Sequence, residues 1–296
     1  MEQKTKQEKN WFDRYYKIMV FIPVTFLIIC LIYLGFFYSQ HGDFIFKDAS
    51  LAGGTTITLT GDIDTAALEA GLRAQFNDIS FRRLTDLRTG ETVSFVIESS
   101  STPDQIRPAI ETIIGMPLTE ENSSIEFTGP TLSQNFYRQL IIALFISFIL
   151  MSIVIFLLFK TFVPSMAVIF AAFADIVIPL AILDFYGVKI SAAGIAAFLM
   201  LIGYSVDTDI LLTSRAIKSR EGTVNSRIYG AFKTGILMTM TALLAVLPAF
   251  FIVSGLPDSF RQIFLILSLG LCADIINTWL TNTGIIKWYC ESKGIK

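Results

Sequence analysis

Histidine, cysteine and charged residues are scarce in this sequence. Its 296 residues include one histidine and three cysteines, and 16% of them are charged, against about 25% in a typical soluble domain. Cys30 and Cys272 lie in apolar blocks and Cys290 lies near the carboxyl end, so the polar part of the chain has no cysteine for a disulfide framework or a zinc site. We interpret His41, the single histidine, as an ordinary surface residue, and we predict neither an enzyme active site nor a bound cofactor.

Apolar residues, by contrast, make up 53% of the chain and gather in long blocks. Six blocks are each long enough to cross a hydrocarbon core, which takes about 20 residues in helical form. Because lipid offers the backbone no hydrogen-bond partners, we predict that each block is a helix. The blocks cover residues 18–38, 139–159, 162–183, 190–213, 233–254 and 262–286. The first exceeds the usual ~7 to 15 apolar residues of a signal peptide, so we expect it to remain as an anchor.

Lysine and arginine are distributed unevenly between the two ends of these helices. The two tails, Lys160 and the segment after the fourth block hold 14 of the 23 basic residues, whereas the short loops on the other side hold only Lys189 and Arg261. Short cytoplasmic loops are enriched in lysine and arginine. We therefore predict cytoplasmic tails at 1–17 and 289–296, a five-helix bundle at 138–288, and an extracytoplasmic domain at 39–137. That domain carries 14 acidic and 6 basic residues, a net charge of -8.

The extracytoplasmic segment alternates strand-like and helix-like apolar periods. Strand patterns surround Ile57, Phe81, Phe95 and Ile125, while one helical pattern follows a cap at Asp64 or Thr65 and another follows Thr102. The order βαββαβ is typical of a ferredoxin-like domain. The predicted fold is therefore a membrane α-helical bundle of six transmembrane helices with one external α+β ferredoxin-like domain between helices 1 and 2.

Four aspartates lie inside the apolar blocks: Asp175 in the third, Asp207 and Asp209 in the fourth, and Asp274 in the sixth. A charged side chain near the bilayer centre costs at least ~2.5 to 3.5 kcal/mol, so none of them faces lipid cheaply. Positions 207 and 209 are about 200° apart on a helix, so at most one of the two points at any given neighbouring helix. A polar series, Asn277, Thr278, Thr281 and Asn282, follows Asp274.

Three interpretations of these aspartates remain open. They form a proton or cation relay, because clustered acids, hydroxyls and amides on inner helices are what a relay requires. Alternatively, they are protonated and hydrogen-bonded between helices as structural contacts. In the third interpretation, Asp209, and with it Asp207, reaches the cytoplasmic surface and pairs with Arg215, which is about 9 Å away along the helix axis from Asp209.

Several short motifs occur in this chain in an order that is typical of one protein family. The polar segment opens with Gly53, Gly54 and Thr55, Gly129 and Pro130 precede the second helix, and small residues including Gly194 let the third and fourth helices approach closely. The fourth helix reads Leu-Ile-Gly-Tyr-Ser, with Gly203, Tyr204 and Ser205, and ends at Arg215. Together with one anchor, one large external segment and five clustered helices, these motifs resemble the SecD/SecF family, in particular its SecF branch, which is related to the RND transporters.

The chain departs from the bacterial pattern of that family at two places. Bacterial members typically read Gly-Tyr-Ser-x-Asn-Asp-Ser/Thr, so their acidic position falls on Thr208 here, with Asp207 and Asp209 on either side. Their His-Asp pair in the third helix corresponds to Ala174 and Asp175. The pattern is similar to the archaeal branch, and Asp175, Asp207 and Asp209 inherit the relay role as candidates.

The resemblance implies an accessory subunit of the Sec translocase without enzymatic activity. It implies a SecD partner, contact with the Sec translocon channel, action on unfolded preproteins outside the membrane, a lipid bilayer environment and no nucleic-acid partner. Two other functions remain open: half of an RND-type small-molecule exporter, and a purely structural scaffold of the translocon.

Overall fold

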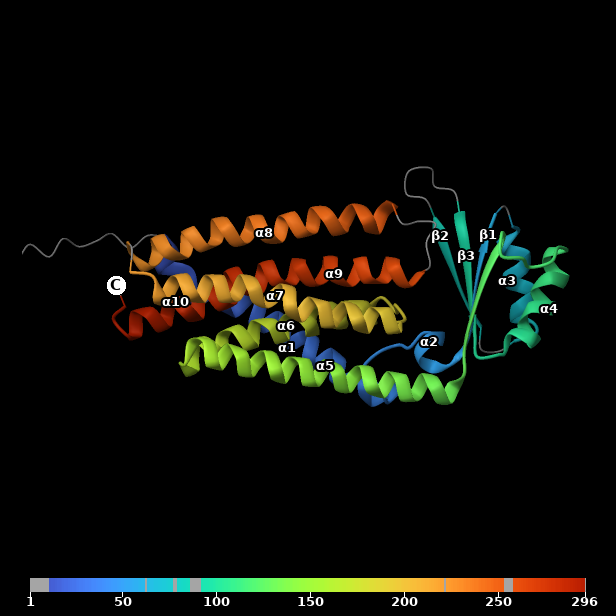
Figure 1. Ribbon diagram of the computed structural model, residues 1–296, viewed down its shortest axis with the longest axis horizontal. Coiled ribbons are helices and arrows are strands. Elements are labelled where there is room, and N and C mark those ends of the chain that lie inside the picture. Colours follow the sequence, from blue (N-terminus) through green and yellow to red (C-terminus); the bar gives the residue numbers. More distant parts are fainter. Residues whose placement is uncertain are drawn as a thin grey trace, which may run out of the picture.

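The computed structural model describes residues 11–61, 63–76, 79–85, 92–220, 222–252 and 258–295. It shows an elongated helical bundle with a smaller lobe at one end (Figure 1). Residues 1–10 of the predicted amino-terminal tail, residues 253 and 254 of the fifth predicted block, and residue 296 lie outside the described part of the chain.

Six long helices build the bundle. They are α1 (Trp11–His41), α5 (Pro130–Phe159), α6 (Phe162–Phe185), α7 (Ala192–Lys218), α8 (Val224–Ile252) and a composite sixth helix made of α9 (Asp258–Ile276), η1 (Asn277–Asn282) and α10 (Thr283–Ser292). Among the described residues, these six are long and apolar enough to cross a membrane. The prediction of six apolar helices is therefore confirmed.

Several helices extend beyond their predicted apolar blocks. The helix α5 begins at Pro130, which occupies the first helical position after Gly129, rather than near residue 139. Proline is well tolerated there because the first N–H groups of a helix have no intrahelical partner. Hydropathy detects only the apolar part of a helix, which lies in the lipid. The helix continues beyond that part as long as its backbone N–H and C=O groups have hydrogen-bond partners.

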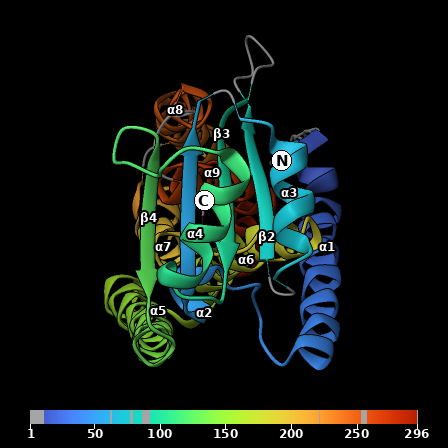
Figure 2. The same cartoon turned by 90° about the vertical axis from the view of Figure 1, so that its right-hand side faces the viewer.

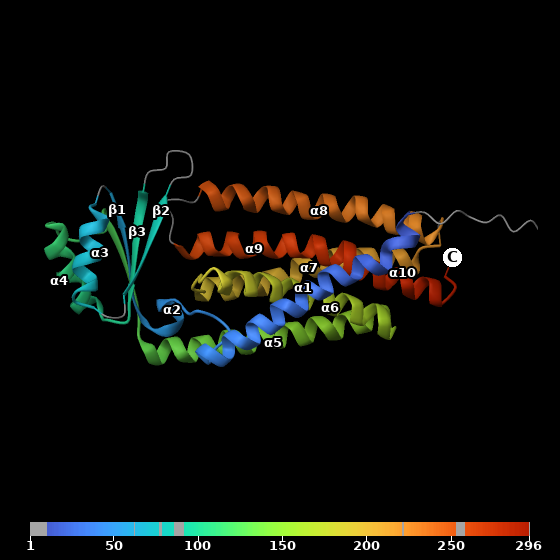
Figure 3. The same ribbon diagram turned by 180° about the vertical axis from the view of Figure 1, so that it is seen from behind.

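The helices α6, α7 and α9 form the inner part of the bundle. In the most apolar window of α6, 61% of the residues are buried, against 6% in α5 and 17% in α8, so the last two helices lie at the periphery. Close approach is possible where glycine replaces a larger residue: a Cβ atom added at Gly270 of α9 would overlap the Leu201 side chain of α7. The start of α1 and the end of α10 both lie at the end of the bundle away from the lobe (Figure 3).

The lobe consists of a four-stranded antiparallel sheet and two helices. Its strands are β1 (Gly54–Thr60), β2 (Ile79–Thr85), β3 (Thr92–Ser99) and β4 (Ser123–Thr128), in the spatial order β2-β3-β1-β4. The helices α3 (Thr65–Arg73) and α4 (Pro103–Ile114) cover the face that points away from the bundle (Figure 2). A short helix, α2 (Ala49–Ala52), precedes β1.

Alternation along the strands divides the sheet into an apolar and a polar face. Ile57 and Phe95 face α3 and α4 and belong to the same core as Leu68 and Ile106. Residues of the opposite parity, including Thr56, Thr58 and Glu98, line a polar cavity between the sheet and the bundle. The alternation of the strands therefore places a polar sheet surface over the end of the bundle.

Both lobe helices begin after a predicted capping residue, with Asp64 rather than Thr65 as the cap of α3. The Asp64 side chain accepts hydrogen bonds from the backbone N–H groups of Ala66 and Ala67, both at 3.1 Å. Thr102 and Gln105 form a capping box at the start of α4. Such caps satisfy N–H groups that have no partner inside the helix.

Candidate functional site: three buried aspartates

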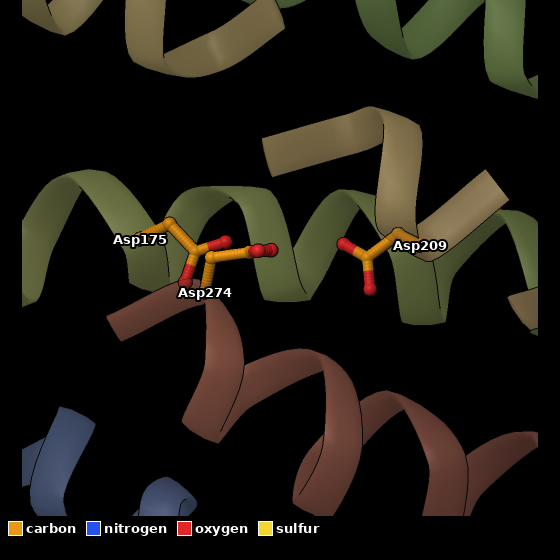
Figure 4. A group of neighbouring side chains, drawn as sticks. All are labelled: Asp175, Asp209 and Asp274. Atoms are coloured by element: carbon orange, nitrogen blue, oxygen red, sulfur yellow. The ribbon is translucent and has the colours of Figure 1, made fainter. Parts of the chain in front are cut away.

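Three of the four predicted aspartates meet inside the bundle. Asp175 lies on α6, Asp209 on α7 and Asp274 on α9, and all three are 0% exposed. One carboxylate oxygen of each lies within 4.8 Å of the corresponding oxygens of the other two. The carboxylates of Asp175 and Asp274 lie close together, and that of Asp209 points toward them (Figure 4).

The segment after Asp274 supplies several of the hydrogen-bond donors. Residues 277–282 form η1, a π-helix inside the sixth membrane helix. Asn277 and Asn282 donate from their side-chain amides to Asp175 and Asp209, each at 2.6 Å. Single π-helical turns are rare and occur frequently at functional sites. The polar series noted in the sequence is therefore part of the aspartate site.

Thr278 bridges two of the aspartates. Its hydroxyl oxygen lies 2.8 Å from Oδ1 of Asp209 and 2.9 Å from Oδ1 of Asp274. A threonine hydroxyl carries one hydrogen and donates it to one acceptor at a time. The second short contact is a hydrogen bond only if that carboxyl group itself carries a proton and donates it to the hydroxyl.

Hydroxyl groups from α7 and α8 complete the surroundings. Ser205 donates to Oδ2 of Asp175, while Thr208 lies 3.0 Å from Oδ1 of Asp274. Thr239 of α8 lies 3.4 Å from the other oxygen of Asp274. Polar contacts thus connect α7 and η1 to the aspartates on both α6 and α9.

The donors that contact these aspartates are all neutral hydroxyl or amide groups in the described contacts. Three ionised carboxylates without a compensating cation would be very unfavourable at full burial. In addition, Oδ2 of Asp209 is buried without a hydrogen-bond partner among the described residues. The arrangement therefore suits groups that hold protons or a hard cation, for which carboxylate oxygens are suitable ligands.

The remaining predicted residues of α7 separate into two sets. Ser205 and Thr208 contact the aspartates, whereas Gly203, Tyr204 and Asp207 are exposed on the opposite face of the helix. The guanidinium of Arg215 donates to the carbonyl of Gly230 and to Thr234 of α8. Asp209 is buried beside Thr278 instead of pairing with Arg215, so the third interpretation of the sequence is wrong for Asp209.

The predicted motifs of the external segment meet at the base of the lobe. Gly53 adopts a φ of 90°, and a Cβ atom there would lie 2.6 Å from Cα of Pro130. Gly54 has a φ of 144° and its missing Cβ leaves room for the carbonyl of Ser99. The Thr55 hydroxyl donates to the carbonyl of Ser101 at 2.6 Å. The Gly-Gly-Thr and Gly-Pro motifs therefore pack the start of β1 against the start of α5.

The sequence did not predict Thr239 as part of the site, because a single threonine in an apolar block does not indicate which residues of other helices it contacts. It also missed the role of Gly194. A Cβ atom at this position would lie 2.5 Å from the Gln262 side chain of α9. The helix periodicity shows that Gly194 suits close packing, but it does not identify the side chain that approaches it.

Comparisons with known proteins agree with this architecture. Residues 112–292 match the family model described as protein export membrane protein SecD/SecF, C-terminal. The chain is 37% identical to the protein-export membrane protein SecF of Methanolacinia petrolearia, over 94% of this chain and 95% of that protein. It is 35% identical to the SecF protein of Methanothermobacter thermautotrophicus, over 93% of each chain.

Solved structures of SecDF have the same fold. The crystal structure of SecDF from Thermus thermophilus, a translocon-associated membrane protein, superposes with a TM-score of 0.76 at 15% identity and covers 96% of this chain. SecDF in its super-membrane-facing form gives a TM-score of 0.62 at 17% identity. The present chain spans 39% of the length of each SecDF chain. From the family model and the full-length relatives, this chain is a member of the SecF family of protein-export membrane proteins.

Proposed function

We propose that this protein is an accessory subunit of the Sec protein-export machinery that couples proton movement through its buried aspartates to preprotein handling outside the membrane. The relatives named above are protein-export membrane proteins, which supports the assignment to export. The observation that carries the coupling is the meeting of Asp175, Asp209 and Asp274 at full burial with neutral donors only in the described contacts.

The hydrogen-bonded contacts form a route along which a proton can pass. It leads from Asp209 through the Thr278 hydroxyl to Asp274, whose carboxylate lies within 4.8 Å of that of Asp175, the acceptor of the Ser205 hydroxyl. Hydroxyl groups accept one proton while donating another, so they link carboxyl groups that do not touch each other. A full charge that crosses the membrane releases ~2.3 kcal/mol per 100 mV. The three aspartates that would take up and release the proton lie on three different helices, α6, α7 and α9.

A SecD subunit is the partner that we propose for the exposed face of α7. The chain spans 39% of a SecDF chain, which leaves a larger second part to be supplied by another subunit. Tyr204 is 52% exposed and Gly203 has open space around its missing Cβ, while Asp207 is exposed within an apolar span. Because a lipid-facing carboxylate is costly, a partner helix with a hydrogen-bond donor or a cation fits this face.

The lobe is proposed to be a ferredoxin-like domain on the extracytoplasmic side. Support comes from the sheet order β2-β3-β1-β4 and from α3 and α4 on one face. The proposed orientation is supported by the carboxyl ends of α5 and α7, which lie at the end of the bundle away from the lobe (Figure 1) and are followed or formed by Lys160, Arg215 and Lys218. Short segments rich in lysine and arginine are typically cytoplasmic. The predicted cytoplasmic tails at 1–17 and 289–296 stay a prediction, with α1 already beginning at Trp11 and α10 ending at Ser292. We propose that the lobe contacts unfolded preproteins outside the membrane.

The proposal can be tested in vesicles that contain the Sec channel, this subunit and its SecD partner. We expect Asp209→Asn and Asp274→Asn to remove the part of secretory-protein translocation that an uncoupler abolishes in the wild type. Asparagine keeps the size and the hydrogen-bonding ability of the side chain, but its amide does not take up or release a proton as a carboxyl group does. Asp104→Asn, on the exposed surface of α4, is the matched control and should translocate normally.

Other outcomes would contradict the coupling. Equal translocation by wild type and both cluster variants, with or without uncoupler, would leave the aspartates as structural contacts only, which is the scaffold interpretation. Efflux of a small molecule by the chain without a SecD partner, with no effect on translocation, would favour the half-size exporter. Thermal unfolding of each variant in detergent separates lost coupling from lost folding.

A further inference from the structure

The outer ends of α7 and α9 meet in one polar junction. Gln262 of α9 is 7% exposed and makes three hydrogen bonds to the segment before α7. Its Oε1 accepts from the backbone N–H of Ser191 at 2.7 Å and from the Ser191 hydroxyl, and its Nε2 donates to the carbonyl of Lys189. Ser191 is the residue that caps α7. A displacement of either helix end therefore acts directly on Lys189.

Lys189 connects this junction to the sheet of the lobe. Its ammonium group lies 2.9 Å from Oε2 of Glu98 on β3 and 2.7 Å from the hydroxyl of Ser80 on β2. Glu98 is only 6% exposed, and Arg82 holds its other oxygen at 2.6 Å. A charge-assisted contact to a carboxylate that is already oriented by a neighbour is specific in direction as well as favourable.

The lobe is also attached to the bundle at its base, through the residue that follows Lys189. Gly53 packs against Pro130 there, and the backbone of Ile190 bonds to Phe46 and Asp48 in the segment that leads to α2. Beside this base, a polar cavity of about 180 Å³ lies between the sheet and the end of the bundle, lined by Thr56 and Glu98 of the sheet and by Lys189 and Gln262 of the bundle. The sheet is thus not packed directly on the bundle over this area, and it has space to tilt about its base.

The same two helices carry the aspartate site. Ser191 and Asp209 are 18 residues apart along α7, about 27 Å of helix, while Gln262 and Asp274 lie on α9. Repacking of α7 against α9 at Asp209 and Asp274 therefore changes the relative position of their outer ends, to which Lys189 is bonded. Helices transmit such shifts as rigid elements when their cores are close-packed.

We propose that Lys189 is a coupling residue, held by Gln262, which transmits the relative motion of α7 and α9 to Glu98 and thereby sets the tilt of the lobe. The proposal rests on the proposed function for its purpose, but the mechanical link itself depends only on the contacts of Lys189. Loss of a hydrogen-bonded charge contact should change the equilibrium between the held and the tilted positions of the lobe by roughly ten- to a hundredfold. Because the Lys189 side chain is 37% exposed, we expect a change of about tenfold in this equilibrium.

The tilt can be measured by electron paramagnetic resonance in the complex with the SecD partner. Spin labels at Thr112→Cys on α4 and Leu244→Cys on α8, both exposed, report the distance between lobe and bundle, in a chain whose three native cysteines are replaced. We expect one narrow distance in the wild type and in Lys189→Arg, which keeps the charge. In Lys189→Met we expect a second, broader population raised about tenfold.

Arg73→Met is the matched control, because it removes an ion pair with Glu69 inside the lobe. It should leave the distance unchanged. The same variants are then assayed for uncoupler-sensitive translocation, which we expect to fall in Lys189→Met and to be retained in Lys189→Arg.

An unchanged distance in Lys189→Met would overturn the proposal, whatever the translocation result. Translocation by Lys189→Met at the wild-type rate would overturn it equally, since the lobe tilt would then not matter. If instead the distance broadens but wild-type translocation proves insensitive to uncoupler, the mechanical link stands and the proton coupling fails, so the two failures are distinguishable.

Discussion

Replacing Thr278 with valine tests the proton route at a single hydroxyl. Valine has nearly the same shape as threonine, so Thr278→Val removes the bridge between Asp209 and Asp274 with little change in packing. Hydroxyl-to-carboxylate hydrogen bonds contribute about 1.5–3 kcal/mol. Here Asn282 still donates to the same oxygen of Asp209, and Thr208 still donates to that of Asp274. We therefore expect a cost near the lower end, about 1–2 kcal/mol in the free energy of unfolding.

Thr278→Ser is the matched control because it keeps the hydroxyl and loses one buried methyl group. That loss costs about 1 kcal/mol, similar to the cost expected for valine. The two variants should therefore unfold at similar temperatures in detergent while differing in proton transfer. A positioned proton-transfer group contributes about a hundredfold or more to a rate, so we expect the uncoupler-sensitive translocation to fall by that order in Thr278→Val.

The assay is translocation of a secretory protein into vesicles, with and without uncoupler, for wild type and both variants. Wild-type rates in Thr278→Val would refute the route through this hydroxyl. Equal impairment of Thr278→Val and Thr278→Ser would show that packing around the methyl group, rather than the hydroxyl, matters.

Three further outcomes are expected. Asp207→Leu should weaken co-purification with the SecD partner; unchanged or stronger recovery would mean that Asp207 faces lipid. Burial raises the pKa of Asp48 from 3.8 to about 6, so the folded protein binds more protons than the unfolded chain between these values. Stability should then fall as pH rises through this range and level off above about 6, by up to about 3 kcal/mol. Asp48→Asn should flatten this dependence in melting curves. Gly53→Ala should lower the melting temperature more than Gly115→Ala, because both have positive φ but only Gly53 meets Pro130; equal effects would exclude the close contact as a cause.

The two acids of the fourth block show how far a sequence can lead. Asp207 and Asp209 both lie in an apolar helix near the same motif, and helix geometry alone places them about 200° apart. The prediction that at most one of them joins a given neighbour is consistent with the structure, in which Asp209 is buried and Asp207 is exposed. The periodicity of one helix does not say how that helix is rotated relative to the others, so it could not select between the two.

The features that could be predicted from the sequence are those that depend on local chemistry. Apolar block length required six membrane helices, strand alternation separated an apolar from a polar sheet face, and Asp64 and Thr102 began the lobe helices, because each depends on contacts within a few residues or with the solvent. Tertiary structure alone decided that Asp175, Asp209 and Asp274 share one site, that Thr239 contributes to it, and that Gln262 and Lys189 join two helix ends to the sheet. Those contacts depend on the rotation and height of helices that are far apart in the chain, and these are set by the close packing of all the helices together.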